Sequence, residues 1–178
     1  MKAQPLLQPA AQPELTVYTD LVYLRTGRPQ QFIDLTGLVA ERVRRSGITR
    51  GLVNVQACHT TTSILVNEFE PELIEDLADL AEQWAPREHG YRHDVRQGMP
   101  PGERANGHAH ARAVLLGASA LLNVDRGAVC LGRWQQILHA ELDGPRKRGI
   151  SIMVMGTREE NGSGSLRWPA RAASGGER

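Results

Sequence analysis

Histidine gathers in a few polar blocks of this chain, and it is the residue type there with the widest chemistry. The residues concerned are His59, His93, His108, His110 and His139. Imidazole is the commonest metal ligand and a proton carrier near neutral pH. On an extended backbone His108 and His110 can reach one ion, and a third histidine (His59 or His93) plus water would complete a catalytic zinc site. On a regular helix, residues two apart point about 200° away from each other, which favours hydrogen-bonded turn histidines instead.

Carboxylates offer a second kind of metal site. The candidates are Glu68, Asp94, Glu141 and Asp143. Oxygen ligands of this kind suit magnesium that is bound together with a phosphate. The sequence therefore predicts a divalent cation but leaves zinc and magnesium open.

A basic cluster follows the last two carboxylates. Arg146, Lys147 and Arg148 come directly after Pro145. Guanidinium groups hold phosphate oxygens bidentately, so the cluster is a candidate phosphate site. The other interpretation is a basic turn whose charge is balanced by the neighbouring carboxylates, and composition does not separate the two.

Hydroxyl and amide groups stand near the first histidine. Thr60, Thr61 and Thr62 follow it at a strand corner, where threonines can donate to a phosphate or satisfy a turn. Asn67 and Glu68 end the next strand, where one can cap a helix while the other faces a site.

The stretch 131–148 is expected to position the last of these groups. It is predicted to be one extended strand that ends in a Gly-Pro turn, so residues alternate between two faces. The odd face, expected to be a site or a subunit contact, holds Gln135, Ile137, His139, Glu141 and Asp143. The even face, expected to be core, holds Trp134, Gln136, Leu138, Ala140 and Leu142.

The rest of the chain alternates strands and helices. Apolar periodicity and turn residues predict strands, helices and connections as follows: strands at 15–24, 31–35, 51–60, 63–69, 121–125, 128–131 and 149–155, a helix at 36–45, a helix from 71 to 85, and a short helix or turn at 108–116. The stretch 87–107 lacks periodicity and is long for a loop, which is typical of a functional segment. Residues 1–13 are expected to be a flexible lead, 14–157 one domain, and 158–178 a disordered tail.

Composition excludes several classes of function. The chain has 178 residues, a net charge of +1 and 4% aromatic residues, which argues against nucleic-acid binding. It has no apolar run long enough for a transmembrane helix, so no membrane partner is expected. Cys58 and Cys130 lie in strand-like apolar runs and are expected to be buried, reduced thiols of a cytoplasmic protein.

Four blocks together resemble the YjbQ family. They are HTTTSILVNE (59–68), YRHD (91–94), NGHAHARAVLLG (106–117) and LGRWQQILHAELDGPRKR (131–148), and the resemblance spans about Thr16 to Gly156. It implies an α+β fold of two packed, mainly antiparallel β-sheets with two main helices, assembled as a homotrimer. It also implies a secondary thiamine-phosphate synthase activity, in which a pyrimidine diphosphate joins a thiazole phosphate and pyrophosphate leaves. Arg133 departs from the family pattern, which has threonine there, and the loop after Asp94 is long.

The sequence is compatible with two functions. The first is a metal-assisted enzyme acting on a phosphorylated small molecule, and the second is a non-catalytic trimer that binds a metal or an anion. For the enzyme, the expected catalytic residues are His59, Glu68, Glu141 and Asp143. The expected substrate- or phosphate-binding residues are Thr60, Asn67, Asn106, Gln135, Arg146 and Arg148, and the expected metal ligands are His93, His108 and His110.

Overall fold

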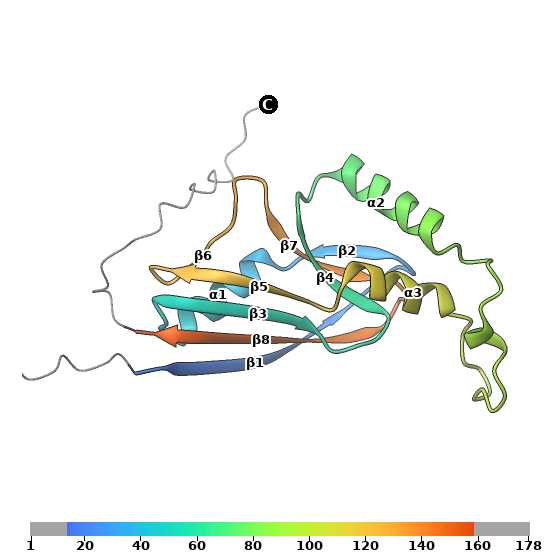
Figure 1. Ribbon diagram of the computed structural model, residues 1–178, viewed down its shortest axis with the longest axis horizontal. Coiled ribbons are helices and arrows are strands. Elements are labelled where there is room, and N and C mark those ends of the chain that lie inside the picture. The colour runs from blue at the N-terminus through green and yellow to red at the C-terminus, as the bar shows by residue number, and fades with distance from the viewer. Residues whose placement is uncertain (1–13, 159–178) are drawn as a thin grey trace, which may run out of the picture.

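The computed structural model describes residues 14–158, so the predicted flexible lead (1–13) and all but the first residue of the predicted disordered tail (158–178) lie outside the described residues. Within that range the chain forms two β-sheets together with three α-helices and one short 3-10 helix (Figure 1). In chain order the elements are β1 (Thr16–Arg25), β2 (Gln31–Asp34), α1 (Thr36–Ser46), β3 (Arg50–Ala57), β4 (Thr62–Asn67), α2 (Pro71–Trp84), η1 (Arg92–Val95), α3 (Gly107–Leu116), β5 (Ser119–Asp125), β6 (Ala128–Val129), β7 (Gln136–Glu141) and β8 (Lys147–Thr157).

The larger sheet has five strands in the order β1-β8-β3-β5-β6, all antiparallel to their neighbours. Its strands alternate in burial because successive side chains point to opposite faces. On β8, Ile150, Ile152 and Val154 are fully buried, whereas Met153 between them is 37% exposed. One face of this sheet is therefore core, and the other carries exposed apolar side chains.

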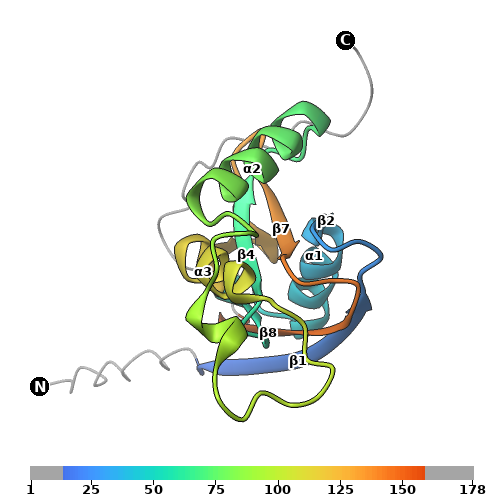
Figure 2. The same cartoon turned by 90° about the vertical axis from the view of Figure 1, so that its right-hand side faces the viewer.

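The smaller sheet has three strands in the order β2-β7-β4 and packs over the inner face of the larger one. The main core between them includes Val53, Ile64, Ile137 and Ile152, closed by α1 through Val39. A second cluster, which includes Phe32, Ala109 and Ala140, joins the other face of β7 to α2 and α3. All three α-helices lie on the same side of β1 and β8 (Figure 2). This arrangement confirms the expected α+β fold of two antiparallel sheets, with three α-helices in the described residues.

The stretch 131–148 differs from its prediction in two ways. The strand β7 begins only at Gln136, because residues 132–135 form a turn. In this turn the side-chain oxygen of Gln135 (Oε1) accepts a hydrogen bond from the Gly132 N–H at 2.8 Å. Both faces of β7 are buried, since it is the central strand of a sheet covered on both sides. The odd face, predicted to be a site or a subunit contact, instead lies largely between the two sheets, where His139 and Glu141 are fully buried.

Two smaller expectations have clear outcomes. Cys58 is exposed and only Cys130 is buried, so the prediction of two buried thiols was wrong for Cys58. No helix in the described part of the chain is long and apolar enough to cross a bilayer.

Candidate functional site

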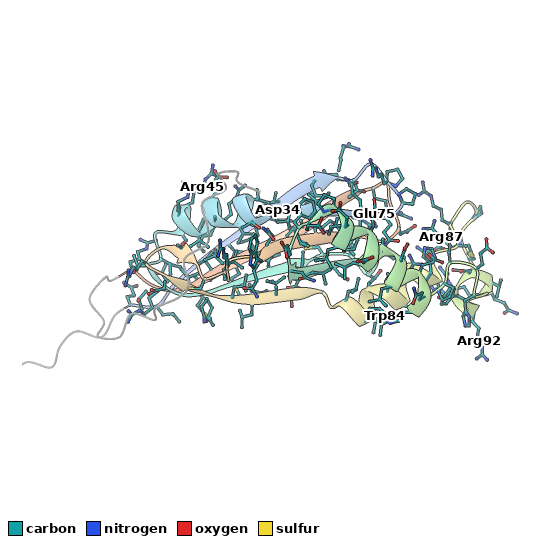
Figure 3. The ribbon with its side chains drawn as sticks, turned by 90° about the horizontal axis from the view of Figure 1, so that it is seen from above. Asp34, Arg45, Glu75, Trp84, Arg87 and Arg92 are labelled. Carbon is teal, nitrogen blue, oxygen red and sulfur yellow. The ribbon has the colours of Figure 1, made fainter. Side chains whose placement is uncertain are left out.

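The candidate site is a polar cavity of about 500 Å³ at the end of the molecule where the loop 87–107 lies. Figure 3 marks that loop by Arg87 and Arg92. Three segments meet there: the corner after β3, the η1–α3 segment and the turn between β7 and β8. The lining residues are His59, Thr60, Thr61, His93, Gly102, Glu103, Arg104, Asn106, His110, Asp143, Pro145, Arg146 and Arg148.

The cavity brings together eight of the thirteen site residues expected from the sequence. They are His59, Thr60, His93, Asn106, His110, Asp143, Arg146 and Arg148. Five others do not line it, namely Asn67, Glu68, His108, Gln135 and Glu141. The sequence also missed Arg104, which lines the cavity and donates from Nη1 to the Gly144 carbonyl at 3.1 Å. It lies in an aperiodic loop, where no pattern in the sequence distinguishes it from a solvent-exposed arginine.

Glu141 lies behind the cavity wall and holds Arg148 in place. Its carboxylate accepts from Arg148 Nε at 2.6 Å and from Nη2 at 2.5 Å, and both side chains are buried. It also accepts from the Thr26 hydroxyl and from the N–H groups of Leu142 and Asp143. Burial raises the pKa of Glu141, but these hydrogen bonds, led by the one from Arg148, outweigh it and the pKa is lowered. Because both oxygens are engaged, the geometry favours a positioning role over the catalytic role expected from the sequence.

Asp143 begins a hydrogen-bonded chain that runs through Asn106 to His93. Its Oδ2 accepts from Arg146 Nη2 at 2.7 Å and from Asn106 Nδ2 at 2.9 Å. Asn106 Oδ1 in turn lies 3.1 Å from His93 Nε2. The chain joins the β7–β8 turn to η1, so Asp143 and His93, which are 50 positions apart in the sequence, are held as one unit.

His59 lines the cavity close to Arg148. Its Nε2 accepts a hydrogen bond from the Gly149 N–H at 2.9 Å. Burial, and then the guanidinium of Arg148, lower the pKa of His59, which keeps the ring neutral. This histidine therefore meets the cavity as a neutral imidazole.

Except for His93, the residues of block 91–94 that have a clear role support the structure around the site and do not line it. Asp94 Oδ1 accepts from the N–H groups of Asn106 at 2.9 Å and Gly107 at 2.8 Å, so it caps α3 from outside the helix. A side chain at Gly107 would lie 2.4 Å from Tyr91 Cβ, which explains why glycine begins α3. The predicted functional loop is thus anchored at its start and its end.

The histidine pair on α3 divides between two environments. His108 is buried, its Nδ1 has no partner in residues 14–158, and burial followed by Arg112 lowers its pKa. His110 faces the cavity with its ring centroid 4.5 Å from that of His93, and its pKa is lowered by burial and then by His93. Because α3 is a regular helix, the two histidines diverge, as the second interpretation of their spacing predicted.

A metal cage of three histidines does not form in the described residues. His108 does not line the cavity, and no group of three or more His, Cys, Asp or Glu side chains there is close enough to hold a metal ion. The expected ligand set of His93, His108 and His110 therefore does not fit a zinc site within one chain.

Asn67, Glu68 and Gln135 lie at the far end of the smaller sheet. In the β4–β7 register Thr62 pairs with Glu141 near the cavity, and Asn67 pairs with Gln136. Five residues of strand separate these two ends by roughly 16 Å. One chain therefore carries two separate groups of the residues selected from the sequence.

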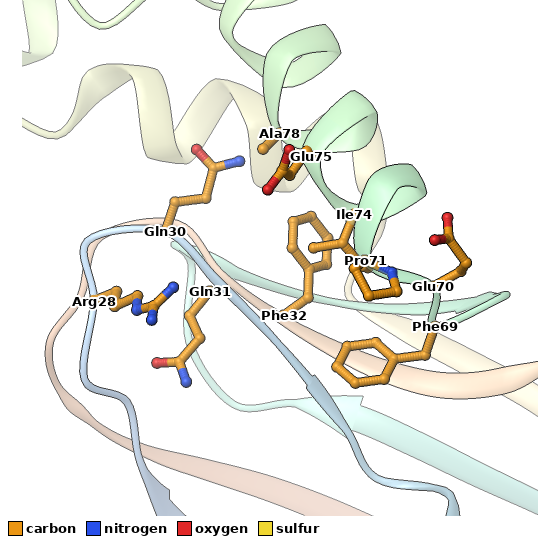
Figure 4. A pocket seen from close by; sticks show the side chains of 10 residues that line it. All are labelled: Arg28, Gln30, Gln31, Phe32, Phe69, Glu70, Pro71, Ile74, Glu75 and Ala78. Atoms are coloured by element: carbon orange, nitrogen blue, oxygen red, sulfur yellow. The ribbon is translucent and has the colours of Figure 1, made fainter.

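A second cavity of about 430 Å³ lies between β2 and the start of α2 (Figure 4). Phe32, Phe69 and Ile74 give it apolar walls. The Glu70 carboxylate at its edge caps α2 by accepting from the N–H groups of Glu72 and Leu73. Among the described residues, its lining holds one cation (Arg28) and no histidine, so the polar cavity is the better candidate for chemistry.

The described architecture has clear relatives. Residues 20–157 match the family described as UPF0047 protein YjbQ-like. A UPF0047 protein of Methanothermobacter thermautotrophicus is 39% identical over 142 residues, which cover 80% of this chain and 94% of the relative. UPF0047 protein YugU of Bacillus subtilis is 32% identical over 75% of this chain and 96% of its own length. Among solved structures, a YbjQ-like protein of unknown function from Sulfolobus solfataricus superposes with a TM-score of 0.75 at 33% identity, covering 80% of this chain and 99% of that one. The chain therefore belongs to the YjbQ-like UPF0047 family.

Proposed function

We propose that the chain is an enzyme that acts on a phosphorylated small molecule in the polar cavity. The observation that carries the proposal is the convergence of three arginines (Arg104, Arg146 and Arg148) with three histidines on a cavity of about 500 Å³. Within residues 14–158, Asp143 pairs with Arg146, Glu141 with Arg148 and Glu103 with Arg96, so Arg104 is a cation of the lining that no carboxylate balances. An anionic ligand of metabolite size fits both the charge and the volume.

Arg146 and Arg148 would hold the phosphate. Each uses Nε and Nη2 in protein hydrogen bonds, which leaves Nη1 of both without a partner in residues 14–158. The anchoring fixes both guanidinium groups before substrate arrives, so binding costs little side-chain entropy. The Thr60 hydroxyl stands in the same lining and can add a donor.

A divalent cation, with magnesium favoured over zinc, would arrive with the phosphate rather than in a protein cage. Magnesium is commonly held by one or two carboxylates plus substrate phosphates, and Asp143 is the cavity carboxylate placed for this role. When bound, such an ion would neutralise charge that develops on a leaving pyrophosphate.

Thiamine phosphate formation is the reaction proposed for a first assay. In it the thiazole nitrogen forms a bond to the pyrimidine methylene carbon, the bond from that carbon to the pyrophosphate oxygen breaks, and pyrophosphate leaves. The arginines would take up the charge of that leaving group. The free thiols suit a reducing compartment, and the proposal includes a cytoplasmic enzyme.

Arg146→Gln is expected to weaken binding of pyrophosphate about 10- to 100-fold, because one charge-assisted hydrogen-bond donor set is lost. Arg146 is chosen over Arg148 because it is 41% exposed and its loss should spare the fold. Titration calorimetry with magnesium pyrophosphate measures the change, alongside thiamine phosphate formation with and without chelator. Arg126→Gln is the matched control, on the exposed β5–β6 turn. Equal affinity in the Arg146 variant and its parent would contradict the proposed site, and tight binding without turnover on any phosphorylated substrate would favour a non-catalytic anion-binding protein.

The proposal includes a homotrimer built on the outer face of the five-stranded sheet. That face carries Val17, Leu21 and Tyr23 on β1 and Leu121 on β5, which are 49–64% exposed. An apolar patch of this kind is typical of an interface, and the occupant proposed is a second copy of the chain.

Light scattering on the purified chain is expected to give three times the 19.6 kDa chain mass. Leu21→Glu should reduce the mass to that of one chain, because a carboxylate would be buried without a partner. Glu75→Gln, on the exposed side of α2, is the control and should leave the mass unchanged. A parent chain that runs as a monomer would contradict the trimer.

A further inference from the structure

Two histidines on the polar cavity have partners that fix opposite protonation patterns. Gly149 N–H can only donate, so His59 Nε2, 2.9 Å away, must accept and carries no proton. A neutral imidazole has one N–H, so the proton of His59 resides on Nδ1. His59 lines the cavity and its Nδ1–H has no partner in residues 14–158, so it is free to donate to a ligand. His59 can be neither a base nor a metal ligand through Nε2.

His93 is fixed the other way by the chain from Asp143. A carboxylate only accepts, so the Asn106 amide must turn Nδ2 toward Asp143 Oδ2, 2.9 Å away. Asn106 Oδ1 then faces His93 Nε2 at 3.1 Å and needs a donor. Asn106 is 7% exposed, so water is a poor substitute for that donor. The proton of His93 therefore resides on Nε2, and Nδ1 presents a lone pair.

Arg96 also approaches the same nitrogen, but it does not reverse this assignment. Its Nη1 lies 3.3 Å from His93 Nε2 and 2.6 Å from the His93 carbonyl oxygen, which is the better acceptor contact. Its Nη2 is held by Glu103 at 2.7 Å to each oxygen. The guanidinium is thus satisfied without the imidazole, whereas Asn106 Oδ1 is not.

We propose that His59 and His93 form a donor–acceptor pair on the polar cavity, with His93 Nδ1 as the catalytic base and Asn106 as its positioning residue. The inference rests on the proposed function. His59 Nδ1–H, with the free Nη1 groups of Arg146 and Arg148, binds an anionic oxygen of the substrate. His93 Nδ1 removes a proton from a substrate O–H or N–H group, so the oxygen or nitrogen keeps the bonding electrons and His93 becomes an imidazolium. Its Nε2–H stays on Asn106 throughout.

The pair narrows the substrate class. A suitable substrate carries a phosphate or another anionic oxygen on one side and an ionisable hydroxyl or amine within reach on the other. Attack by a thiazole nitrogen, which has no proton to lose, would leave His93 Nδ1 without a task. A requirement for His93 in turnover therefore separates this class from simple thiamine phosphate formation.

Long-range proton–nitrogen NMR of the full chain labelled with ¹⁵N tests the assignment without substrate. At a pH above the ordinary histidine pKa, we expect His59 with its proton on Nδ1 and His93 with its proton on Nε2, each assigned by its loss in a His→Gln variant. The exposed His89 is the internal control. Asn106→Ala should convert His93 to a mixture of tautomers and leave His59 unchanged. His59 protonated at Nε2, or His93 at Nδ1, would overturn the pair.

Added probes separate the roles further. Inorganic pyrophosphate should shift the His59 Nδ1 resonance and leave the His93 tautomer as it was. Equimolar zinc that shifts His93 Nδ1 would make it a metal ligand and overturn its role as base. On a phosphorylated substrate whose reacting group is a hydroxyl or an amine, His93→Gln should lower kcat about 10²- to 10⁴-fold with a smaller change in KM, and an unchanged kcat there would also overturn the base. Failure of the proposed function would look different from failure of this inference. In that case pyrophosphate would shift the resonances of neither histidine, while both tautomers would stay as assigned.

Discussion

Glu141→Gln is expected to lower the free energy of unfolding by about 3–5 kcal/mol, because it leaves a buried guanidinium without its counter-charge. Glu141 and Arg148 are 0% and 4% exposed, and the carboxylate accepts from Arg148 at 2.5 and 2.6 Å. The glutamine of the variant has the same shape and keeps one acceptor oxygen. Its NH₂ group, however, would face donors that need an acceptor. Removing one partner of a buried ion pair costs more free energy of unfolding than the pair contributes net, because the remaining charge stays buried without a counter-charge.

Urea unfolding at neutral pH measures the effect. Glu103→Gln is the matched control, because Glu103 pairs with Arg96 in a partly exposed ion pair whose loss should cost about 1 kcal/mol or less. The pKa of Glu141 is lowered in the folded state, so its contribution is present above its unfolded pKa and is lost as the pH falls through the lowered value. The difference between parent and variant should therefore shrink in acid. A loss no larger than that of the Glu103 variant would contradict the account of Arg148 as an anchored cation.

The ion pair links the core of the fold to the chemistry of the site. Arg148 donates hydrogen bonds from Nε and Nη2 to Glu141 and Thr61, so only Nη1 remains for a ligand. The strands β7 and β8 thus carry a buried pair whose outer edge forms the cavity wall. In the proposed function, binding of an anion would depend on a charge that the core has already oriented, which is the kind of preorganisation that electrostatic catalysis uses.

The sequence predicted the convergence of the site better than the role of each residue. Composition and spacing drew attention to His59, His93, Asp143 and Arg146, and folding brings all four to one cavity. Periodicity could not assign His108 and His110, because their fate depends on whether the backbone there is helical. Only the structure reveals that the Glu141 carboxylate accepts hydrogen bonds from five donor groups, two of them on Arg148. The other three, from Thr26, Leu142 and Asp143, could not be predicted from the alternation of residues along a strand.

The alternation in 131–148 was also insufficient to predict burial. Period-two patterning indicates which residues share a face, but it does not indicate whether both faces are covered. Because β7 is central in its sheet and both of its faces are packed, His139 is enclosed although imidazole is normally a half-exposed group. That enclosure has a measurable consequence.

His139→Leu is expected to stabilise the fold, against the usual direction of core substitutions. His139 is 0% exposed, and neither ring nitrogen has a partner in residues 14–158. Buried polar atoms without hydrogen bonds cost about 1–3 kcal/mol each, and leucine fills a similar volume without them. We therefore expect a gain of about 1–3 kcal/mol in the free energy of unfolding at neutral pH, measured by urea denaturation, with His89→Gln on the exposed loop as the control. A destabilised His139→Leu variant would mean that the ring has a partner that the apolar side chain cannot replace.

The pH dependence of the same variant gives the sharper result. Burial lowers the pKa of His139 from 6.5 to about 4, against the opposing effect of Glu141. Between these two values the unfolded chain binds a proton that the folded chain does not, so stability falls as the pH drops from 6.5 toward 4, and below 4 the effect is complete. The span corresponds to about 3 kcal/mol. The burial-lowered pKa values of His59, His108 and His110 add to the acid loss of the parent and the variant alike, so the difference between the two curves isolates His139. Parallel curves for parent and His139→Leu across this range would show that the buried ring does not titrate with unfolding.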